Sequence, residues 1–231
     1  MEIVVSDYLR PLVAWKRDGD KNYYPSGRFA GSCFFIDSEG TAITCSHIIE
    51  GLAENEVLFS LDDESNSNVP VTVVWQHPTD DFAIIKLPVE GNKFFNLRHD
   101  RTILGLDVMS YGFLNGGVAN GEIKIDYRFM KGYVSRVDST PELLRSQGIL
   151  ETSYPSLSGF SGTAVFCKNG HELDLVGMLF NNSESTVEVF SFKEVSESGS
   201  VEFSESVNRI VELGVAHTTD TIVSYLKEFQ S

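Results

Sequence analysis

The feature that most constrains the fold is a rhythm of short apolar runs, each closed by Gly, Asn, Asp or Pro. Several runs are β-branched or aromatic and alternate with polar residues, as in residues 123–127, which is typical of a half-buried strand. The predicted strands are residues 32–36, 41–44, 57–61, 69–75, 82–87, 107–111, 123–130, 132–137, 148–152, 164–167, 173–179 and 187–192. Residues 38–40 and 168–170 supply glycine for two hairpin turns. Strands at this spacing predict an all-β barrel or sandwich.

The end of the chain breaks this rhythm. We expect one helix over residues 204–213, stopped by Gly214, and a second over residues 219–229, where Asp220 in the first turn complements the helix dipole. The second helix places Ile222, Val223, Leu226 and Phe229 on one face. A short helical insertion is expected at 140–147 and an exposed loop at 196–200. The sequence therefore predicts an all-β body with a helical tail.

Charge and composition exclude several classes of function. The 231 residues carry 18 basic and 33 acidic side chains, a net charge of −15 that would repel phosphate backbones and anionic lipid. We therefore expect no nucleic acid and no membrane among the partners. Hydrophobic residues at 42% are too many for a disordered chain, and the longest uncharged run, 152–167, is too rich in Ser, Gly and Pro to span a bilayer. This composition predicts a soluble globular protein.

The cysteine count and the first residues point to one compartment. Three cysteines (Cys33, Cys45 and Cys167) make no disulfide framework, and residues 1–7 hold neither a basic leader nor an apolar core of a secretory signal. Cys33 and Cys45 lie on adjoining predicted strands and could approach each other, but we expect reduced thiols. A cytoplasmic location follows as the expectation.

Three segments combine the residue types of nucleophilic catalysis in the order His, Asp, Ser. His47 follows a predicted hairpin, Asp81 stands directly before an apolar strand, and Ser161 lies in a glycine-flanked turn before another strand. A serine hydroxyl is a weak nucleophile, so a neutral imidazole must accept its proton and a carboxylate must hold that imidazole in the correct tautomer. The pattern indicates a serine nucleophile activated by a His–Asp pair.

These segments resemble those of chymotrypsin-fold serine peptidases, most of all the bacterial high-temperature-requirement proteases and related trypsin-like peptidases. The matching motifs are Gly31-Ser32-x-Phe34, Asp37-x-x-Gly40, Thr44-x-x-His47, Asp81-Phe82-Ala83-Ile84-Ile85-Lys86, Leu150-Glu151-Thr152 nine positions before Ser161 (161 − 152), and Val165-Phe166-Cys167 with Leu175-Val176-Gly177-Met178. The resemblance runs from about Arg28 to Phe192. Each motif alone is weak, but three in order with the connecting strands are specific.

The resemblance implies a fold of two packed antiparallel six-stranded β-barrels with a C-terminal α-helical tail. Residues 1–98 would form the barrel that holds His47 and Asp81, residues 99–203 the barrel that holds Ser161, and residues 204–231 the tail. The helix from Thr219 would cover an outer surface.

The resemblance also implies a serine endopeptidase that works through an acyl-enzyme. His47 would be the general base, Asp81 its orienting acid and Ser161 the nucleophile, with the N–H groups of Gly159 and Ser161 as the oxyanion hole. The substrate-binding strand edge would be Phe180, Asn181 and Asn182, pairing with a protein or peptide substrate. Pro155 stands six positions before the nucleophile (161 − 6), where trypsin-like enzymes that select Arg and Lys carry a carboxylate, so a small to medium apolar P1 residue is expected.

Departures from the family pattern concern regulation more than catalytic atoms. Gly162-Thr163-Ala164 replaces the usual Gly-Gly-Pro, and Phe180 stands where many members have a Ser near the buried Asp. Phe160 replaces the Asp that animal zymogens use on activation, so no such cleavage is expected. Phe160 should instead hold the turn by packing, with the oxyanion hole dependent on a loop at 114–121. A regulatory protein partner is expected, and no peptide-binding PDZ domain follows in the chain as given.

Alternative interpretations stay open at this level. Asp80 competes with Asp81 as the orienting acid, and the whole protein could be a catalytically silent peptide-binding or scaffold module of the same fold. An α/β-hydrolase is excluded because Thr163 breaks Gly-x-Ser-x-Gly and because the acid and the His precede the Ser. The other histidines, expected beside loop residues, are His77, His99, His171 and His217; they follow no metal-ligand spacing, so no metal and no cofactor are expected.

Overall fold

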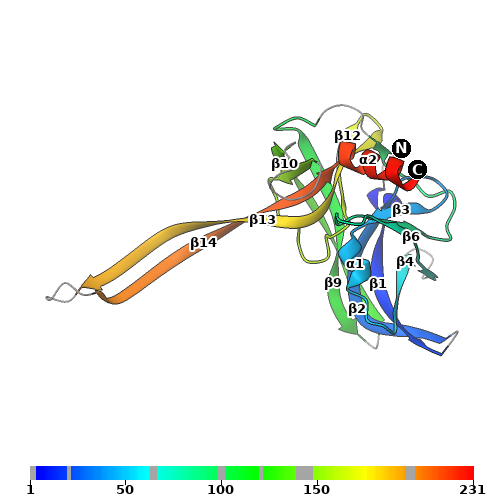
Figure 1. Ribbon diagram of the computed structural model, residues 1–231, viewed down its shortest axis with the longest axis horizontal. Helices are drawn as coiled ribbons and strands as arrows, with labels where there is room; N and C mark the ends of the chain where they lie inside the picture. The colour runs from blue at the N-terminus through cyan, green and yellow to red at the C-terminus, as the bar shows by residue number, and fades with distance from the viewer. Residues whose placement is uncertain are drawn as a thin grey trace.

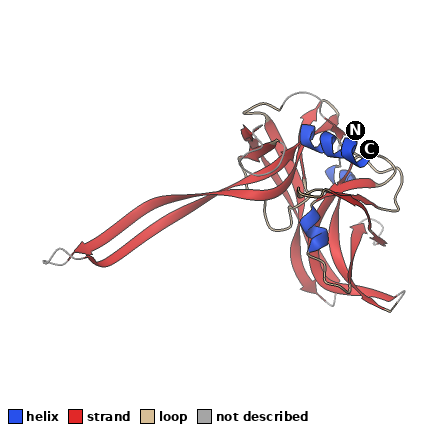
Figure 2. Ribbon diagram, viewed as in Figure 1, coloured by secondary structure: helices blue, strands red, loops and turns tan. Residues whose placement is uncertain are grey.

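The computed structural model describes residues 4–19, 22–62, 67–97, 102–119, 122–138, 148–195 and 201–231. Strands dominate these residues, and they gather into two sheets with a long two-stranded extension to one side (Figures 1 and 2). None of the helices in these ranges is long and apolar enough to cross a membrane.

The first sheet is an open half-barrel with the strand order β5-β4-β1-β2-β3-β7-β6. Its strands are β1 (Leu9–Asp18), β2 (Asn22–Phe35), β3 (Thr41–Thr44), β4 (Glu56–Asp62), β5 (Ser67–Pro70), β6 (Thr72–Gln76) and β7 (Ala83–Lys86). Two short helices belong to the same part of the chain, η1 (Val5–Tyr8) and α1 (Ser46–Glu50). The short strands β3 and β7 bury nearly every side chain, which explains why they read as continuous apolar runs in the sequence.

The second sheet closes into a six-stranded barrel. Its order is β12-β9-β10-β11-β14-β13-β8, and an additional β12–β13 pairing joins the ends of the six-stranded ring. Its strands are β8 (Asn96–Leu97), β9 (Asp107–Ala119), β10 (Glu122–Asp138), β11 (Ile149–Thr152), β12 (Ala164–Asn169), β13 (Glu172–Val195) and β14 (Val201–Thr218). The predicted all-β class is confirmed, and the second sheet has the expected six-stranded closure whereas the first stays open.

Some element bounds differ from the prediction. Residues 123–130 and 132–137 form one strand, β10, residues 69–75 divide into β5 and β6, and the expected loop at 114–121 is strand up to Ala119. The division at residue 98 stays a prediction, although β8 lies before it and pairs with β13 of the second sheet. The predictions for 140–147 and 196–200, and the expected loop position of His99, fall outside the described residues.

The predicted helix over 204–213 is wrong. These residues belong to β14, which pairs antiparallel with β13 along nearly its whole length. The predicted strands 173–179 and 187–192 are likewise parts of the single strand β13. Cross-strand hydrogen bonds with a distant segment overrode a local apolar spacing that also suits a helix. Of the predicted helical tail, only α2 (Thr219–Phe229) is helical, as expected.

The helix α2 connects the two sheets. Thr218 caps it by accepting a hydrogen bond from the Thr221 N–H, and Ile222 and Tyr225 are buried. Tyr225 contacts Phe82 with ring centroids 5.0 Å apart, so the helix packs on the loop between β6 and β7 as well as on β13 and β14. The main core cluster accordingly contains residues of α2 and of both sheets.

Candidate active site

His47 is positioned by the junction between β3 and α1. The strand ends at Thr44, Cys45 is the N-cap of α1, and His47 is the second residue of this one-turn helix. The buried Ser46 hydroxyl donates a hydrogen bond of 2.7 Å to the Phe82 carbonyl just before β7. This bond fixes α1 beside the segment that carries Asp81.

His47 and Asp81 form a two-point contact. The His47 Nδ1 lies 2.6 Å from Asp81 Oδ2, and the His47 backbone N–H donates to Asp81 Oδ1 over 2.9 Å. The hydrogen bond with Asp81 raises the pKa of His47 although burial acts in the opposite direction. Burial alone would raise the pKa of Asp81, but the hydrogen bonds from His47 hold it below its usual value. The contact with Asp81 therefore holds the imidazole ring in one orientation and leaves Nε2 as the nitrogen that can accept a proton.

Asp80 has a different environment from Asp81. Its carboxylate accepts a hydrogen bond from the Tyr225 hydroxyl of α2 and lies near His77, and its backbone N–H donates to His77 Nδ1 over 2.9 Å. This geometry makes Asp80 a connection to α2, whereas Asp81 faces His47.

Behind Asp81 lies His217, for which the sequence predicts a place beside loop residues. It is instead a buried residue of β14, and its Nε2 lies 3.3 Å from the Asp81 carbonyl oxygen. Its ring stacks on Phe180 with centroids 4.2 Å apart. Burial lowers the pKa of His217 to about 4, so the ring is neutral and Nε2–H donates to Asp81. Phe180 thus acts on the Asp81 loop through His217, a contact that no sequence spacing signals.

The Cys45 thiol also lies beside the His–Asp pair. One ligand atom each of Cys45, His47 and Asp81 lie within 4.8 Å of one another, which is close enough to raise the question of a metal ion. Burial and the neighbouring Asp81 carboxylate raise the pKa of Cys45 well above its usual value. Metal ions bind the thiolate, and both Asp81 oxygens already accept hydrogen bonds from His47, so this donor set does not fit a metal.

The turn with Ser161 is held by backbone contacts. The Ser32 N–H donates to the Ser161 carbonyl and the Ser32 hydroxyl to the Gly159 carbonyl, each over 3.0 Å, while the Gly162 N–H donates to Leu179 over 2.9 Å. Gly159 and Gly162 have φ of 97° and 81°, a backbone region that favours glycine. A Cβ on Gly162 would lie 2.1 Å from the Ser32 carbonyl oxygen, so only glycine fits there.

Two N–H donors of the same turn have no acceptor among the residues that the structure describes. The Phe160 and Gly162 N–H groups are bonded to Leu157 and Leu179, but within the described ranges those of Gly159 and Ser161 donate to no acceptor. Phe160 is fully buried, and it packs so closely on Gly112 of β9 that a Cβ there would lie 2.6 Å from its ring. The turn is therefore held by a buried aromatic ring while two adjacent N–H groups stay available.

Ser161 and α1 face each other across Gly31. A Cβ on Gly31 would lie 2.5 Å from the Ile48 side chain and 3.2 Å from the Ser161 carbonyl oxygen, so little space separates the turn from the helix that carries His47. Among the described residues, no hydrogen bond joins the Ser161 hydroxyl to the His47 ring. In enzymes without bound substrate, hydrogen bonds between catalytic groups are often long, and they shorten in the substrate complex.

The predicted substrate-binding residues lie in the loop after β11 and in β13. Pro155 is half-buried and follows Tyr154, whose carbonyl accepts a 2.8 Å hydrogen bond from the Gly214 N–H. The Asn182 side chain binds both the N–H and the carbonyl of Ser156, over 2.6 and 2.8 Å. Asn181 is exposed. Asn182 therefore fixes the 155–156 loop, while its predicted contact with substrate stays a prediction.

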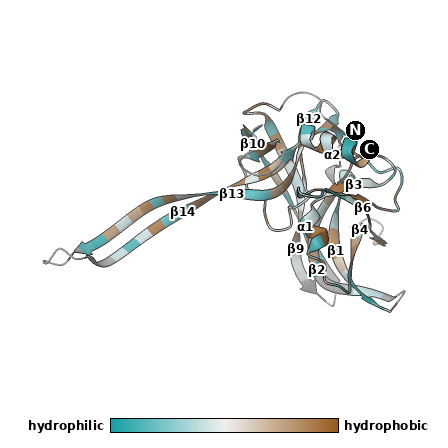
Figure 3. Ribbon diagram, viewed as in Figure 1, coloured by the Kyte–Doolittle hydropathy of each residue, from teal (hydrophilic) through white to brown (hydrophobic). Residues whose placement is uncertain are grey.

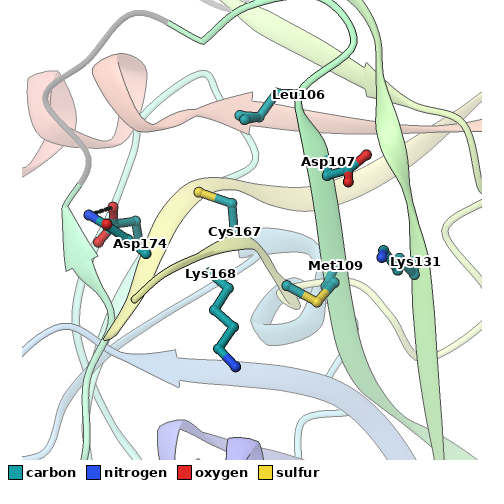
Figure 4. A pocket seen from close by; sticks show the side chains of 8 residues that line it. Leu106, Asp107, Met109, Lys131, Cys167, Lys168 and Asp174 are labelled. Carbon is teal, nitrogen blue, oxygen red and sulfur yellow. Dashed lines mark hydrogen bonds between the residues drawn. The ribbon is translucent and has the colours of Figure 1, made fainter. Parts of the chain in front are cut away.

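An open hollow of about 510 Å³ lies elsewhere on the second barrel (Figure 4). Asp107 and Met109 of β9, Lys131 of β10 and Cys167 and Lys168 of β12 are among its lining residues. None of the predicted catalytic residues lines it, so the hollow is separate from the His47–Asp81 site.

The two sheets and the candidate site together match a known architecture. A half-barrel that carries an Asp-oriented His, packed against a barrel with a glycine-flanked Ser, is the chymotrypsin-like architecture. The chain belongs to the trypsin-like peptidase domain family, whose sequence pattern matches residues 31–178. No curated protein sequence matches the chain.

Solved structures support the same fold. The chain is similar to the HtrA-type protease AlgW with a decapeptide, with a TM-score of 0.61 and 16% identity over 96% of this chain. It spans 64% of the length of AlgW. It is also similar to an inactive mutant form of Rv3671c from M. tuberculosis H37Rv, with a TM-score of 0.60, 14% identity, and coverage of 97% of this chain and 87% of that one. The predicted resemblance to HtrA-type trypsin-like peptidases is confirmed.

Proposed function

We propose that this protein is a serine endopeptidase with His47 as general base, Asp81 as its orienting acid and Ser161 as nucleophile. The observation that carries the proposal is the two-point contact between His47 and Asp81, in which both carboxylate oxygens accept hydrogen bonds. This contact keeps the proton on Nδ1 and leaves Nε2 as the base.

In the proposed acylation step, Ser161 Oγ attacks the carbonyl carbon of the scissile peptide bond and its proton passes to His47 Nε2. The carbonyl oxygen becomes an oxyanion that accepts hydrogen bonds from the Gly159 and Ser161 N–H groups. Loss of one such donor in other enzymes costs about 3–4 kcal/mol of barrier. The C–N bond then breaks, His47 returns the proton to the leaving amine, and an ester joins the acyl group to Ser161.

Deacylation repeats these steps with water. His47 Nε2 removes a proton from the water, whose oxygen attacks the ester carbon, and the same N–H groups stabilise the second oxyanion. The ester bond breaks, His47 protonates Ser161 Oγ, and a carboxylic acid product leaves. Asp81 stays ionised throughout and stabilises the imidazolium in each half-reaction.

The proposed substrate is an extended polypeptide with an uncharged P1 residue. AlgW, similar in fold, was solved with a decapeptide, which supports a peptide as the substrate class. Pro155, at the predicted specificity position, has no charge to pair with Arg or Lys. Burial of an unpaired guanidinium costs several kcal/mol, so P1 Arg and Lys should be poor.

We also propose that the full-length chain needs no N-terminal cleavage for activity. The buried Phe160 holds the turn without an ion pair, so a freed terminal amine would find no carboxylate at that position. A protein partner is the proposed regulator, since an unregulated peptidase would endanger the reducing cytoplasm in which we place this chain. Burial, which raises the pKa of Cys33 to about 12, favours the unreactive thiol form there.

A fluorophosphonate probe tests the proposal directly. Wild-type protein should be labelled, alone or with a partner, Ser161→Ala should not, and Ser158→Ala, an exposed serine three positions away, serves as the matched control that retains labelling. Absence of labelling in every variant would instead support the silent peptide-binding module. Labelling only after trimming of the N-terminus would contradict the proposed activation.

A further inference from the structure

The long extension beside the second barrel is a two-stranded arm. Beyond the pair Ser183 and Leu213, β13 and β14 pair only with each other among the described residues, and they project away from both sheets (Figure 1). Isolated two-stranded ribbons are marginally stable in water. The arm therefore calls for an additional contact that the described residues do not supply.

The two faces of the arm differ in polarity. Cross-strand partners share a face, and the pairs Ser185–Val211, Val187–Arg209, Phe190–Val207 and Phe192–Glu205 lie on one side. The other side carries Glu184–Glu212, Thr186–Ile210, Glu188–Asn208, Ser191–Ser206 and Lys193–Ser204. Brown apolar segments recur along this part of β13 and β14 in Figure 3.

The first face carries an apolar stripe, which we define as Val187, Phe190, Phe192, Val207 and Val211. Phe190 is 56% exposed and Val207 is 52% exposed, and the other three side chains are also exposed. Contiguous exposed apolar surface on a soluble protein commonly marks an interaction site. The arm is thus an amphipathic ribbon whose apolar side is uncovered.

We propose that the apolar stripe binds the same stripe of a second copy of this chain. The two arms would lie antiparallel and face to face, with a two-fold axis that runs between them, perpendicular to the strands, at the level of the Phe190–Val207 pair. In this arrangement β14 lies over β14 of the partner, Val207 meets its own counterpart, and Val187 meets Phe192 of the partner subunit. Aligned face-to-face packing of this kind is normal for β-sheets, and a two-fold interface uses the same patch twice.

The charges on this face select a second copy as the occupant. Along β14 the face reads Val211, Arg209, Val207 and Glu205, so a two-fold axis at Val207 places Arg209 opposite Glu205 of the partner subunit, and the reverse. Neither Arg209 nor Glu205 has an ion pair within the described residues. A stripe that is apolar at its centre and carries opposite charges at equal distances on either side is complementary to itself.

The net charge of −15 does not oppose this arrangement. Each arm runs six residues of β14 from Leu213 to the axis (213 − 207), so the bodies stand about 40 Å apart at the bases of the arms. That separation exceeds the Debye length of about 8 Å at physiological ionic strength. The face of the arm opposite the apolar stripe, which we call the polar face, carries Glu184, Glu188 and Glu212. These glutamates would point away from the partner.

Sedimentation velocity on the full-length protein, from about 1 to about 100 µM, tests the proposal. The wild type should dimerise, and Phe190→Ser should be monomeric. Arg209→Glu and Glu205→Arg should each raise the dissociation constant about tenfold, and the double exchange should restore it to within about threefold. Glu188→Arg on the polar face is the matched control and should leave dimerisation unchanged, with circular dichroism confirming the fold of each variant.

A wild type that stays monomeric at every concentration would overturn the proposal. So would a dimer that Phe190→Ser does not weaken, or charge variants that the double exchange does not rescue. Co-sedimentation with phosphatidylcholine vesicles is run in parallel. A monomeric chain that binds these vesicles through Phe190 would assign the stripe to a lipid surface and would equally overturn the proposal.

Discussion

The two halves of the candidate site are built in different ways. On one side, each contact involves a side chain: the Asp81 carboxylate accepts hydrogen bonds from the His47 ring and the His47 backbone N–H, and the His217 ring donates to the Asp81 carbonyl. On the other side, backbone holds backbone: Ser32 and Leu179 fix the turn around Ser161. The acid–base half should therefore respond to charge and pH, whereas the nucleophile half should respond to steric change at its glycines.

Removal of the nucleophile or of the base tests whether the two halves work as one unit. Ser161→Ala and His47→Ala should each lower kcat by about 10⁶, and the double variant should be no worse than either, because a triad loses its function as a whole. Single-turnover kinetics on a peptide substrate measure this. Additive losses would show that the two halves act separately.

The adjacent carboxylates Asp80 and Asp81 should differ in what their loss affects. Asp81→Ala should lower kcat by about 10⁴, because His47 loses its orientation. Asp80→Ala should leave kcat within about tenfold, yet lower stability by about 1–3 kcal/mol, because the Tyr225 hydroxyl loses a buried acceptor. Kinetics and urea unfolding separate the two effects. A larger kinetic loss for Asp80→Ala than for Asp81→Ala would show that Asp80 is the orienting acid.

The nucleophile half is tested by an added methyl group. Gly162→Ala would place a Cβ against the Ser32 carbonyl at a φ of 81°, so it should cost on the order of 3 kcal/mol of stability and abolish probe labelling. Gly170→Ala is the matched control, with a φ of 61° and open space around the Cβ, and should cost about 1 kcal/mol with labelling intact. Equal losses in the two variants would mean that backbone strain alone, and not the contact with Ser32, matters.

The buried His217 makes the stability of the acid–base half depend on pH. Its pKa is about 4 when folded and about 6.5 when unfolded, so between these values the unfolded chain binds more protons. The stability present above pH 6.5 should fall as the pH drops toward 4, by on the order of 3 kcal/mol in total. Chemical unfolding across this range measures the slope. The slope should be reduced in His217→Gln, and an unchanged slope would contradict the assignment.

The smallest effect is a shift in the pH profile of activity. The base must be neutral, and the hydrogen bond with Asp81 raises the pKa of His47, so kcat/KM should rise with pH through an inflection above 6.5. Asp81→Asn should move that inflection downward. The Gly170→Ala variant provides a reference in which the inflection stays where it is. An inflection that Asp81→Asn leaves in place would belong to another group.

Features that depend on neighbouring residues could be predicted from the sequence. His47 after β3, Asp81 before β7 and Ser161 in its glycine turn all lie in short segments with characteristic local patterns, and the helix from Thr219 carries its own cap and apolar face. Strands such as β3 and β12 were also predictable, because apolar runs closed by turn residues have few other folded forms.

Features that depend on distant partners became visible in the folded chain alone. Residues 204–213 have Val207, Ile210 and Val211 at a spacing that suits a helix, but pairing with β13 makes them a strand. His217 acquires its role from Phe180 and from Asp81, which is 136 residues earlier in the chain. The open first half-barrel and the long arm of β13 and β14 likewise depend on which distant strands pair. Local patterns record what a segment prefers, whereas hydrogen bonds and burial between remote segments decide which preference is satisfied.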